Sequence, residues 1–226
     1  MERPAGSGLP TRVVSDHVLQ PRDRFIYWLL TVSGVAAIAA FFFFWFQLQA
    51  WGEHPFVMAV CSGLFAVLLI NNLGRWLILP SMKRPRTVLP RPGWKVAVVT
   101  TYVSEIEPLD LLEQTLTALV NLDYPHDTWV LDEGDDERVK QVCAALGVHH
   151  FSRKSFPGYQ AEVGMFRKAS RYGNYNAWLH ETGFDRYEIL TAFDLDHVPD
   201  RSYLTNVLGF FDDARVGYVQ APQVYG

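Results

Sequence analysis

The sequence predicts an α/β domain built on a mostly parallel sheet and preceded by a hairpin of two transmembrane helices. Two observations lead to this fold class. From Trp94 onward, short β-branched runs alternate with segments of helical periodicity, which is typical of parallel strands joined by crossover helices. Upstream, residues 25–51 and 55–74 contain no charged residue, and each run exceeds the ~18 to 20 apolar residues that cross a bilayer.

Basic residues flank the two apolar runs on their outer sides. They are Arg3, Arg12, Arg22 and Arg24 before the first run and Lys83, Arg84, Arg86 and Arg91 after the second. The short connection, residues 47–54, has neither lysine nor arginine and carries Glu53. The positive-inside rule therefore predicts a multi-pass protein of the inner (plasma) membrane, with the N-terminus and the α/β domain in the cytoplasm. A cleavable signal peptide is disfavoured, because the first run is too long and lacks a clear small-residue cleavage site.

These signals divide the chain into four parts, with the lipid bilayer as one partner. Residues 1–24 form a cytoplasmic tail, 25–79 two transmembrane helices, 80–93 a basic, proline-rich linker at the membrane surface, and 94–226 the α/β domain. The formal charge of −4 averages over these unlike parts, and we expect no nucleic-acid partner. The two cysteines, Cys61 and Cys143, exclude a disulfide framework and a cysteine-based zinc site.

Local patterns predict the elements of the α/β domain in order. Residues 95–101 are β-branched and apolar, which predicts a buried first strand. Residues 109–121 carry Leu112, Leu116 and Leu119 at helical spacing, which predicts the first crossover helix. The same alternation predicts further strands at 128–131, 148–151, 187–193 and 216–220, further helices at 137–146, 174–182 and 201–211, and a loop at 152–165.

The segment 188–200, EILTAFDLDHVPD, is the most informative part of the chain. An apolar strand ends there in Asp194, Asp196 and His197. Alternate residues of an extended chain face the same side, so both carboxylates can point at one cation. Oxygen ligands of this kind suit Mg²⁺ or Mn²⁺ held together with substrate phosphates. The alternative is a strand followed by an ordinary polar turn.

A second acidic cluster, Asp132 to Glu137, follows the second predicted strand. The carboxyl ends of parallel strands meet at one edge of the sheet, so this cluster is expected beside Asp194 and Asp196. A carboxylate such as that of Asp132 can accept hydrogen bonds from a base or a ribose. Alternatively, Asp135, Asp136 and Glu137 cap the following helix, because acidic side chains favour the first helical turn.

Five motifs occur in a characteristic order. They are Asn-Leu-Asp-Tyr-Pro at 121–125, Val-Leu-Asp-Glu-Gly at 130–134, Gly-Asn-Tyr-Asn-Ala-Trp-Leu at 173–179, Phe-Asp-Leu-Asp-His-Val-Pro at 193–199 and Val-Gln-Ala-Pro-Gln at 219–223. This order resembles the family-2 glycosyltransferases, in particular the membrane-embedded, processive enzymes of the cellulose-synthase type. The resemblance covers residues 94–226 and implies the N-terminal, donor-binding part of a GT-A (Rossmann-like) domain.

The resemblance also implies roles for individual residues. Asp132 would bind the uridine of a UDP-sugar, although Glu133 stands where the family has a second aspartate and either carboxylate can meet the base. Asp194 and Asp196 would hold Mg²⁺ or Mn²⁺ on the diphosphate, with His197 beside them. The remaining substrate-binding candidates are Arg171, which replaces the family's lysine, and Asn174 and Asn176, which would lie beside the nucleotide. Gln220 and Gln223 match a loop that lines the sugar site. Alternatively, these two glutamines belong to a strand that simply leads into a turn.

The implied function is inverting transfer of a sugar, with UDP-glucose as the expected donor, to a growing polysaccharide such as cellulose or a related β-glucan. Accessory export subunits are possible partners. The family's general base and acceptor motifs are expected after Gly226, so we expect the chain to be a donor-binding half that is inactive alone, with no catalytic residue of its own. Two alternatives remain: a non-catalytic, membrane-anchored nucleotide-sugar-binding module, and a non-processive transferase acting on a lipid acceptor.

Overall fold

The helices and strands of the chain fall into two units, Val13–Arg86 and a second unit that begins at Thr87. The computed structural model describes residues 13–104 and 106–222. The first unit holds the apolar helices and the second holds the α/β domain.

The first unit is a helical hairpin made of α1 (Pro21–Trp45), α2 (Ala50–Glu53) and α3 (Pro55–Ile78). Both long helices begin with a proline, whose fixed φ and missing N–H suit the first helical position. The hydroxyl of Tyr27 donates to the carbonyl of Trp76 (2.6 Å), and the indole of Trp45 donates to Ser62 Oγ (2.9 Å). Both helices are long and apolar enough to cross a membrane, with mean hydropathies of 2.0 and 2.1. The predicted pair of apolar helices is thus confirmed, whereas their orientation stays a prediction.

A short antiparallel ribbon, which the sequence analysis did not predict, joins the two flanks of the hairpin. It pairs β1 (Ser15–His17) with β2 (Lys83–Pro85), which follows a 3-10 turn, η1 (Leu79–Ser81). The guanidinium of Arg86 donates two hydrogen bonds to the carboxylate of Asp16, at 2.8 and 2.9 Å. The predicted tail and linker therefore contact each other.

The second unit contains a four-stranded parallel sheet with the strand order β5-β4-β3-β6. The strands are β3 (Val96–Tyr102), β4 (Asp127–Asp132), β5 (His149–Phe151) and β6 (Ile189–Phe193). The central strand β3 pairs in parallel with both β4 and β6. The predicted α/β class with a parallel sheet and flanking helices is confirmed.

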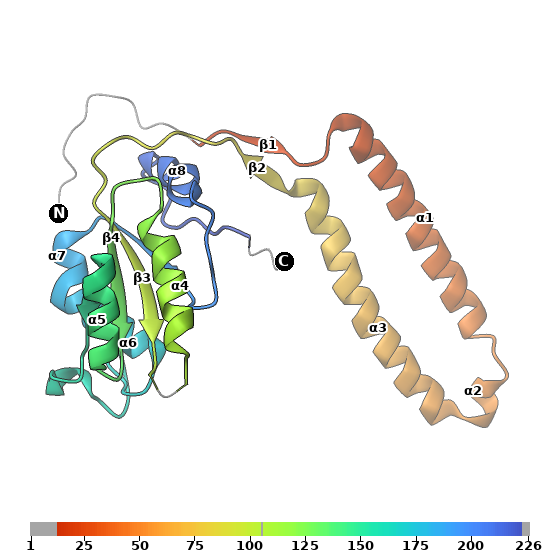
Figure 1. Ribbon diagram of the computed structural model, residues 1–226. Coiled ribbons are helices and arrows are strands. Elements are labelled where there is room, and N and C mark those ends of the chain that lie inside the picture. The colour runs from red at the N-terminus through yellow and green to blue at the C-terminus, as the bar shows by residue number, and fades with distance from the viewer. Residues whose placement is uncertain (1–12, 105, 223–226) are drawn as a thin grey trace. The chain divides into compact units, whose positions relative to one another are not determined.

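Helices cover both faces of this sheet, as alternate residues of β3 require. Val96 and Val98 pack in the core cluster under α4 (Leu109–Val120), α5 (Glu137–Leu146) and α8 (Tyr203–Leu208). Ala97 and Val99 pack on the opposite face against Trp178 of α6 (Arg171–Trp178). Figure 1 shows α4 and α5 side by side on one face of the strands. The remaining short elements are η2 (Pro157–Tyr159), the π-helical turn η3 (Leu179–Gly183), α7 (Phe184–Arg186) and η4 (Gly209–Asp212).

The predicted strand at residues 216–220 is wrong. Those residues have no regular secondary structure, and Tyr218 is largely exposed. A β-branched, aromatic run gains strand hydrogen bonds only when a neighbouring strand pairs with it, and no described strand does so here. The helix predicted at 174–182 also differs, since it begins at Arg171, where the side chain of Ser170 caps it by accepting from Gly173 N.

Candidate functional site

The acidic clusters after β4 and β6 lie at the same edge of the sheet. In the parallel ladders, Tyr102 of β3 pairs with Asp132, and Thr100 of β3 pairs with Phe193, which directly precedes Asp194. Both clusters therefore follow the carboxyl ends of the strands that flank β3. Ligands of open α/β sheets bind at this edge.

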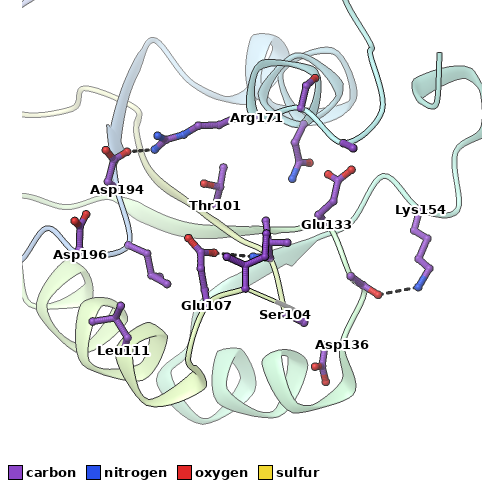
Figure 2. Close-up of a pocket in the computed structure, with 17 residues that line it drawn as sticks. Thr101, Ser104, Glu107, Leu111, Glu133, Asp136, Lys154, Arg171, Asp194 and Asp196 are labelled. Carbon is purple, nitrogen blue, oxygen red and sulfur yellow. Dashed lines mark hydrogen bonds and ion pairs between the residues drawn. The ribbon is translucent and has the colours of Figure 1, made fainter. Parts of the chain in front are cut away.

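A cavity of about 990 Å³ opens at this edge. Its polar lining includes Thr101 near the end of β3, Ser104 and Glu107 after β3, Glu133 and Asp136 after β4, Lys154, Arg171 and Asn174, and Asp194 and Asp196 after β6. Figure 2 shows Asp194, Asp196 and the guanidinium group of Arg171 at one end of the cavity. Glu133, Asp136 and Lys154 lie at the other end. The cavity is thus elongated, with a different set of charged groups at each end.

One end of the cavity holds a candidate divalent-cation site. One ligand atom from each of Asp194, Asp196 and His197 lies within 4.8 Å of the others. Two carboxylates with an imidazole form a donor set that suits Mn²⁺ and, through the oxygens, Mg²⁺. The guanidinium of Arg171 forms an ion pair with Asp194 Oδ1 (Figure 2). The three residues proposed from the sequence as metal ligands are therefore close enough to share an ion.

Asp132 is fully buried and does not line the cavity. Its carboxylate accepts hydrogen bonds from Gly134 N (2.8 Å) and Asp136 N (2.6 Å), and His150 Nε2 lies 3.1 Å away. These contacts fix the turn between β4 and α5. The adjoining carboxylate of Glu133 lines the cavity instead, held by the guanidinium of Arg153 at 2.7 and 3.0 Å.

Asp136 lines the cavity and also caps α5, as the helix-capping alternative proposed. Its Oδ1 accepts a hydrogen bond from Arg138 N (2.8 Å), and its Oδ2 pairs with the Arg138 guanidinium (2.6 Å). The side-chain and backbone hydrogen bonds from Arg138 lower the pKa of Asp136 to about 2. Asp136 is therefore ionised at neutral pH.

The amide of Asn174 is the most informative polar group of the cavity. Asn174 lines the cavity although only 2% of its surface is exposed. Its Nδ2 donates to the carbonyl of Leu131 (3.2 Å), and its buried Oδ1 has no hydrogen-bond partner among the residues that the structure describes. Buried polar atoms are rarely left unpaired, because each one costs the free energy of desolvation. An unpaired acceptor on a residue that lines a cavity is a candidate to receive a hydrogen bond from a ligand, once a small shift of the wall exposes it.

The other predicted substrate contacts lie elsewhere. Asn176 is not among the lining residues, and its Nδ2 donates to the carbonyl of Met165 (2.9 Å), which supports the loop before α6. Gln220 lines a second cavity of about 1060 Å³, together with Asp196 and His197. Gln223 lies outside the described residues.

The lining residues that were not predicted from the sequence include Thr101, Ser104, Glu107 and Lys154. Thr101 lies near the carboxyl end of β3, and Ser104 and Glu107 follow that end, so the rule that placed the acidic clusters could also have placed these three residues. Glu107 Oε2 accepts from Val103 N (2.7 Å), and Lys154 Nζ donates to the carbonyl of Gly134 (2.9 Å; Figure 2). Nothing in the local sequence marks Lys154, which lies in a loop.

Known proteins similar to this chain include cellulose synthase catalytic subunits. The chain is 30% identical over 207 residues to the cellulose synthase catalytic subunit (UDP-forming) of Pseudomonas fluorescens strain SBW25, which covers 89% of this chain and 24% of that protein. The corresponding subunit of Xanthomonas axonopodis pv. citri is 25% identical, covering 89% of this chain and 25% of the relative. The predicted resemblance to cellulose synthase-like family-2 glycosyltransferases is confirmed.

The cellulose synthase relatives are much longer than this chain, which spans about a quarter of their length. No protein-family model matches the chain. Among solved structures, a mannosyltransferase from Pyrobaculum calidifontis in complex with GDP-mannose and Mn²⁺ is similar at 20% identity, with a TM-score of 0.47, over 71% of this chain and 44% of that one.

Proposed function

We propose that the chain is the donor-binding part of a membrane-bound, metal-dependent glycosyltransferase that uses a UDP-sugar. The observation that carries this proposal is the cavity, whose lining combines Asp194 and Asp196 of the candidate cation site with the amide of Asn174 and the carboxylate of Glu133. A sugar nucleotide has matching parts: a diphosphate that binds cations, ribose hydroxyls that donate hydrogen bonds, and a base.

The charges of the cavity support a requirement for a cation. Among the described lining residues, Glu133 and Asp136 are paired with Arg153 and Arg138 behind the lining, whereas Asp194 and Asp196 have only the guanidinium of Arg171 and the imidazole of His197 as basic neighbours. A diphosphate that approached Asp194 and Asp196 would be repelled by their carboxylates unless positive charge came with it. A divalent cation on Asp194, Asp196 and His197 would supply that charge and stabilise the leaving diphosphate.

Each residue then has a role in binding. Arg171, which pairs with Asp194 in the structure, can donate instead to a phosphate oxygen. Asn174 Oδ1 would accept from a ribose hydroxyl. Glu133 would accept from the N–H of the uracil ring, a role that Asp132 would not share, because the Asp132 carboxylate is buried and engaged by backbone N–H groups.

The finer features of the function rest on the relatives and on the apolar hairpin. The relatives are cellulose synthase subunits described as UDP-forming, which supports UDP-glucose as donor and a growing β-glucan as acceptor, with accessory export subunits as further partners. The basic flanks of α1 and α3 support a cytoplasmic position of the cavity, where sugar nucleotides are available. Gln220 would contact the sugar from the side of the second cavity, and the resemblance assigns a sugar contact to Gln223 as well.

Titration calorimetry on the full chain in detergent tests the proposal. We expect UDP to bind in the presence of Mn²⁺ or Mg²⁺ and to bind much more weakly in EDTA. The Asp196→Asn variant should lose this dependence on metal, and Asp110→Asn, on the exposed start of α4, is the matched control that should keep it. A chain that binds UDP equally well with and without metal would contradict the metal-dependent role.

A further inference from the structure

Arg153 is a completely buried arginine just behind the wall of the cavity. Its Nε and Nη2 donate to the two oxygens of Glu133, at 3.0 and 2.7 Å. Its remaining bonds go to backbone carbonyls of the loop that follows, from Nη1 to Tyr159 (3.2 Å) and Arg167 (2.9 Å) and from Nη2 to Ser170 (3.4 Å). Burial of a guanidinium is tolerated only when its charge and its donors are satisfied, and here one carboxylate and three carbonyls do so.

These bonds connect the two ends of the cavity. Glu133 directly follows β4 and lines one end, whereas Ser170 caps α6, the helix that carries Arg171 and Asn174. The backbone of α6 lies directly against Arg153: a Cβ added at Gly173 would be 2.7 Å from Arg153 Nη1 and 2.2 Å from the carbonyl of Arg167. One planar group therefore fixes the orientation of Glu133 and the position at which α6 begins.

We propose that Arg153 is a positioning residue for recognition of the nucleotide base. The inference rests on the proposed function, because it assigns a nucleotide to the cavity. Arg153 does not line the cavity; it acts by holding the Glu133 carboxylate in the wall, with its charge partly neutralised, so that the carboxylate can accept a hydrogen bond from a base. Uracil carries an N–H at the ring position where cytosine has only a lone pair, so a correctly held carboxylate favours UDP over CDP.

A lysine cannot replace this arginine. The lysine ammonium is a point charge with three donors, and it lacks the planar fork that matches a carboxylate. In an Arg153→Lys variant the positive charge would remain, but the two parallel bonds to Glu133 and the bonds to three carbonyls could not all be made. Glu133 would then adopt other orientations, and the discrimination between the two pyrimidines would fall.

A residue that merely stabilises the fold would weaken the binding of all nucleotides alike, so the ratio of affinities separates the two roles. We would measure the affinities of the full chain for UDP and CDP in the presence of Mn²⁺, and the affinity for Mn²⁺ alone, in the wild type and in Arg153→Lys. The destabilised control is Val139→Ala, which removes part of a buried α5 side chain away from the cavity.

We expect Arg153→Lys to weaken UDP binding on the order of tenfold, to bring the UDP-to-CDP affinity ratio close to one, and to leave Mn²⁺ affinity unchanged. Val139→Ala should keep the wild-type ratio. If Arg153→Lys fails to fold, Glu133→Gln tests the same pair and should also lose the preference for UDP. A wild type that binds neither nucleotide removes the proposed function and this inference with it. A wild type that prefers UDP, together with variants that keep that preference, overturns the inference alone.

Discussion

If Asp194 holds a metal ion, as proposed, Arg171 would compete with that ion for the carboxylate, and Arg171→Gln would change the Mn²⁺ affinity and the UDP affinity in opposite directions. In the structure the guanidinium of Arg171 pairs with the Asp194 carboxylate, and the two side chains are 50% and 44% exposed. Arg171→Gln removes the competing cation, so the affinity for Mn²⁺ in the absence of nucleotide should rise. The same change would remove the proposed donor to the diphosphate, so the affinity for UDP in the presence of Mn²⁺ should fall.

The exposure of the Arg171–Asp194 pair sets the size of the first effect. Exposed ion pairs contribute about 0.2–1 kcal/mol, and 1.4 kcal/mol corresponds to a tenfold change, so the Mn²⁺ affinity should rise about 1.4- to 5-fold. A hydrogen bond to a charged group contributes about 1.5–3 kcal/mol, which makes the loss of UDP affinity at least about tenfold.

Titration of Mn²⁺ followed by electron paramagnetic resonance measures the free ion and hence the first effect, and calorimetry with UDP measures the second. Arg171→Lys is the matched control: it keeps the positive charge and should stay near the wild type in both measurements. The reasoning about Asp194 fails if Arg171→Gln lowers the Mn²⁺ affinity, or if the lysine and glutamine variants behave alike.

Three further predictions concern single residues. Asp196→Asn should weaken Mn²⁺ binding at least about tenfold, measured by the same titration, while UDP affinity in EDTA stays constant. Gly173→Ala should lower the free energy of unfolding by about 1–3 kcal/mol, seen as a lower urea midpoint, because the new methyl group would overlap the carbonyl of Arg167; an unchanged midpoint would contradict this packing. The pKa of Asp136 is about 2 in the fold, below its unfolded value, so its pairing with Arg138 stabilises the protein above about pH 4 and ceases to do so as the pH falls toward 2. The difference in urea midpoint between the wild type and Asp136→Asn should therefore disappear over that range.

The strands at the centre of the domain could be predicted from sequence because their signal is local. β3, β4 and β6 are short apolar runs whose side chains are buried on one or both faces of the sheet. Their apolar, β-branched composition therefore predicts buried strands directly. The ribbon of β1 and β2 has no such signal. Its six residues are exposed, and the pairing depends on two segments that are brought together by the helical hairpin.

At the candidate site, sequence reasoning found the residue types and the sheet edge but not the direction of each side chain. Asp132 and Glu133 are neighbouring acids at the end of one strand, yet Asp132 turns back to the N–H groups of its own turn and Glu133 lines the cavity. The choice depends on the conformation of the turn. Arg153 gave no signal at all, because its partners lie between 6 and 20 residues away along the chain.

The pairing of β1 with β2 bears on how this protein can be shortened. A truncation that removes the residues up to Gln20 leaves helix α1 intact. The same truncation removes β1 and the carboxylate of Asp16. Residues 83–86 would then lose their ladder and their ion pair. In such a shortened protein, residues 83–86 would be less constrained, so its behaviour should not be taken to represent that of a chain that keeps β1.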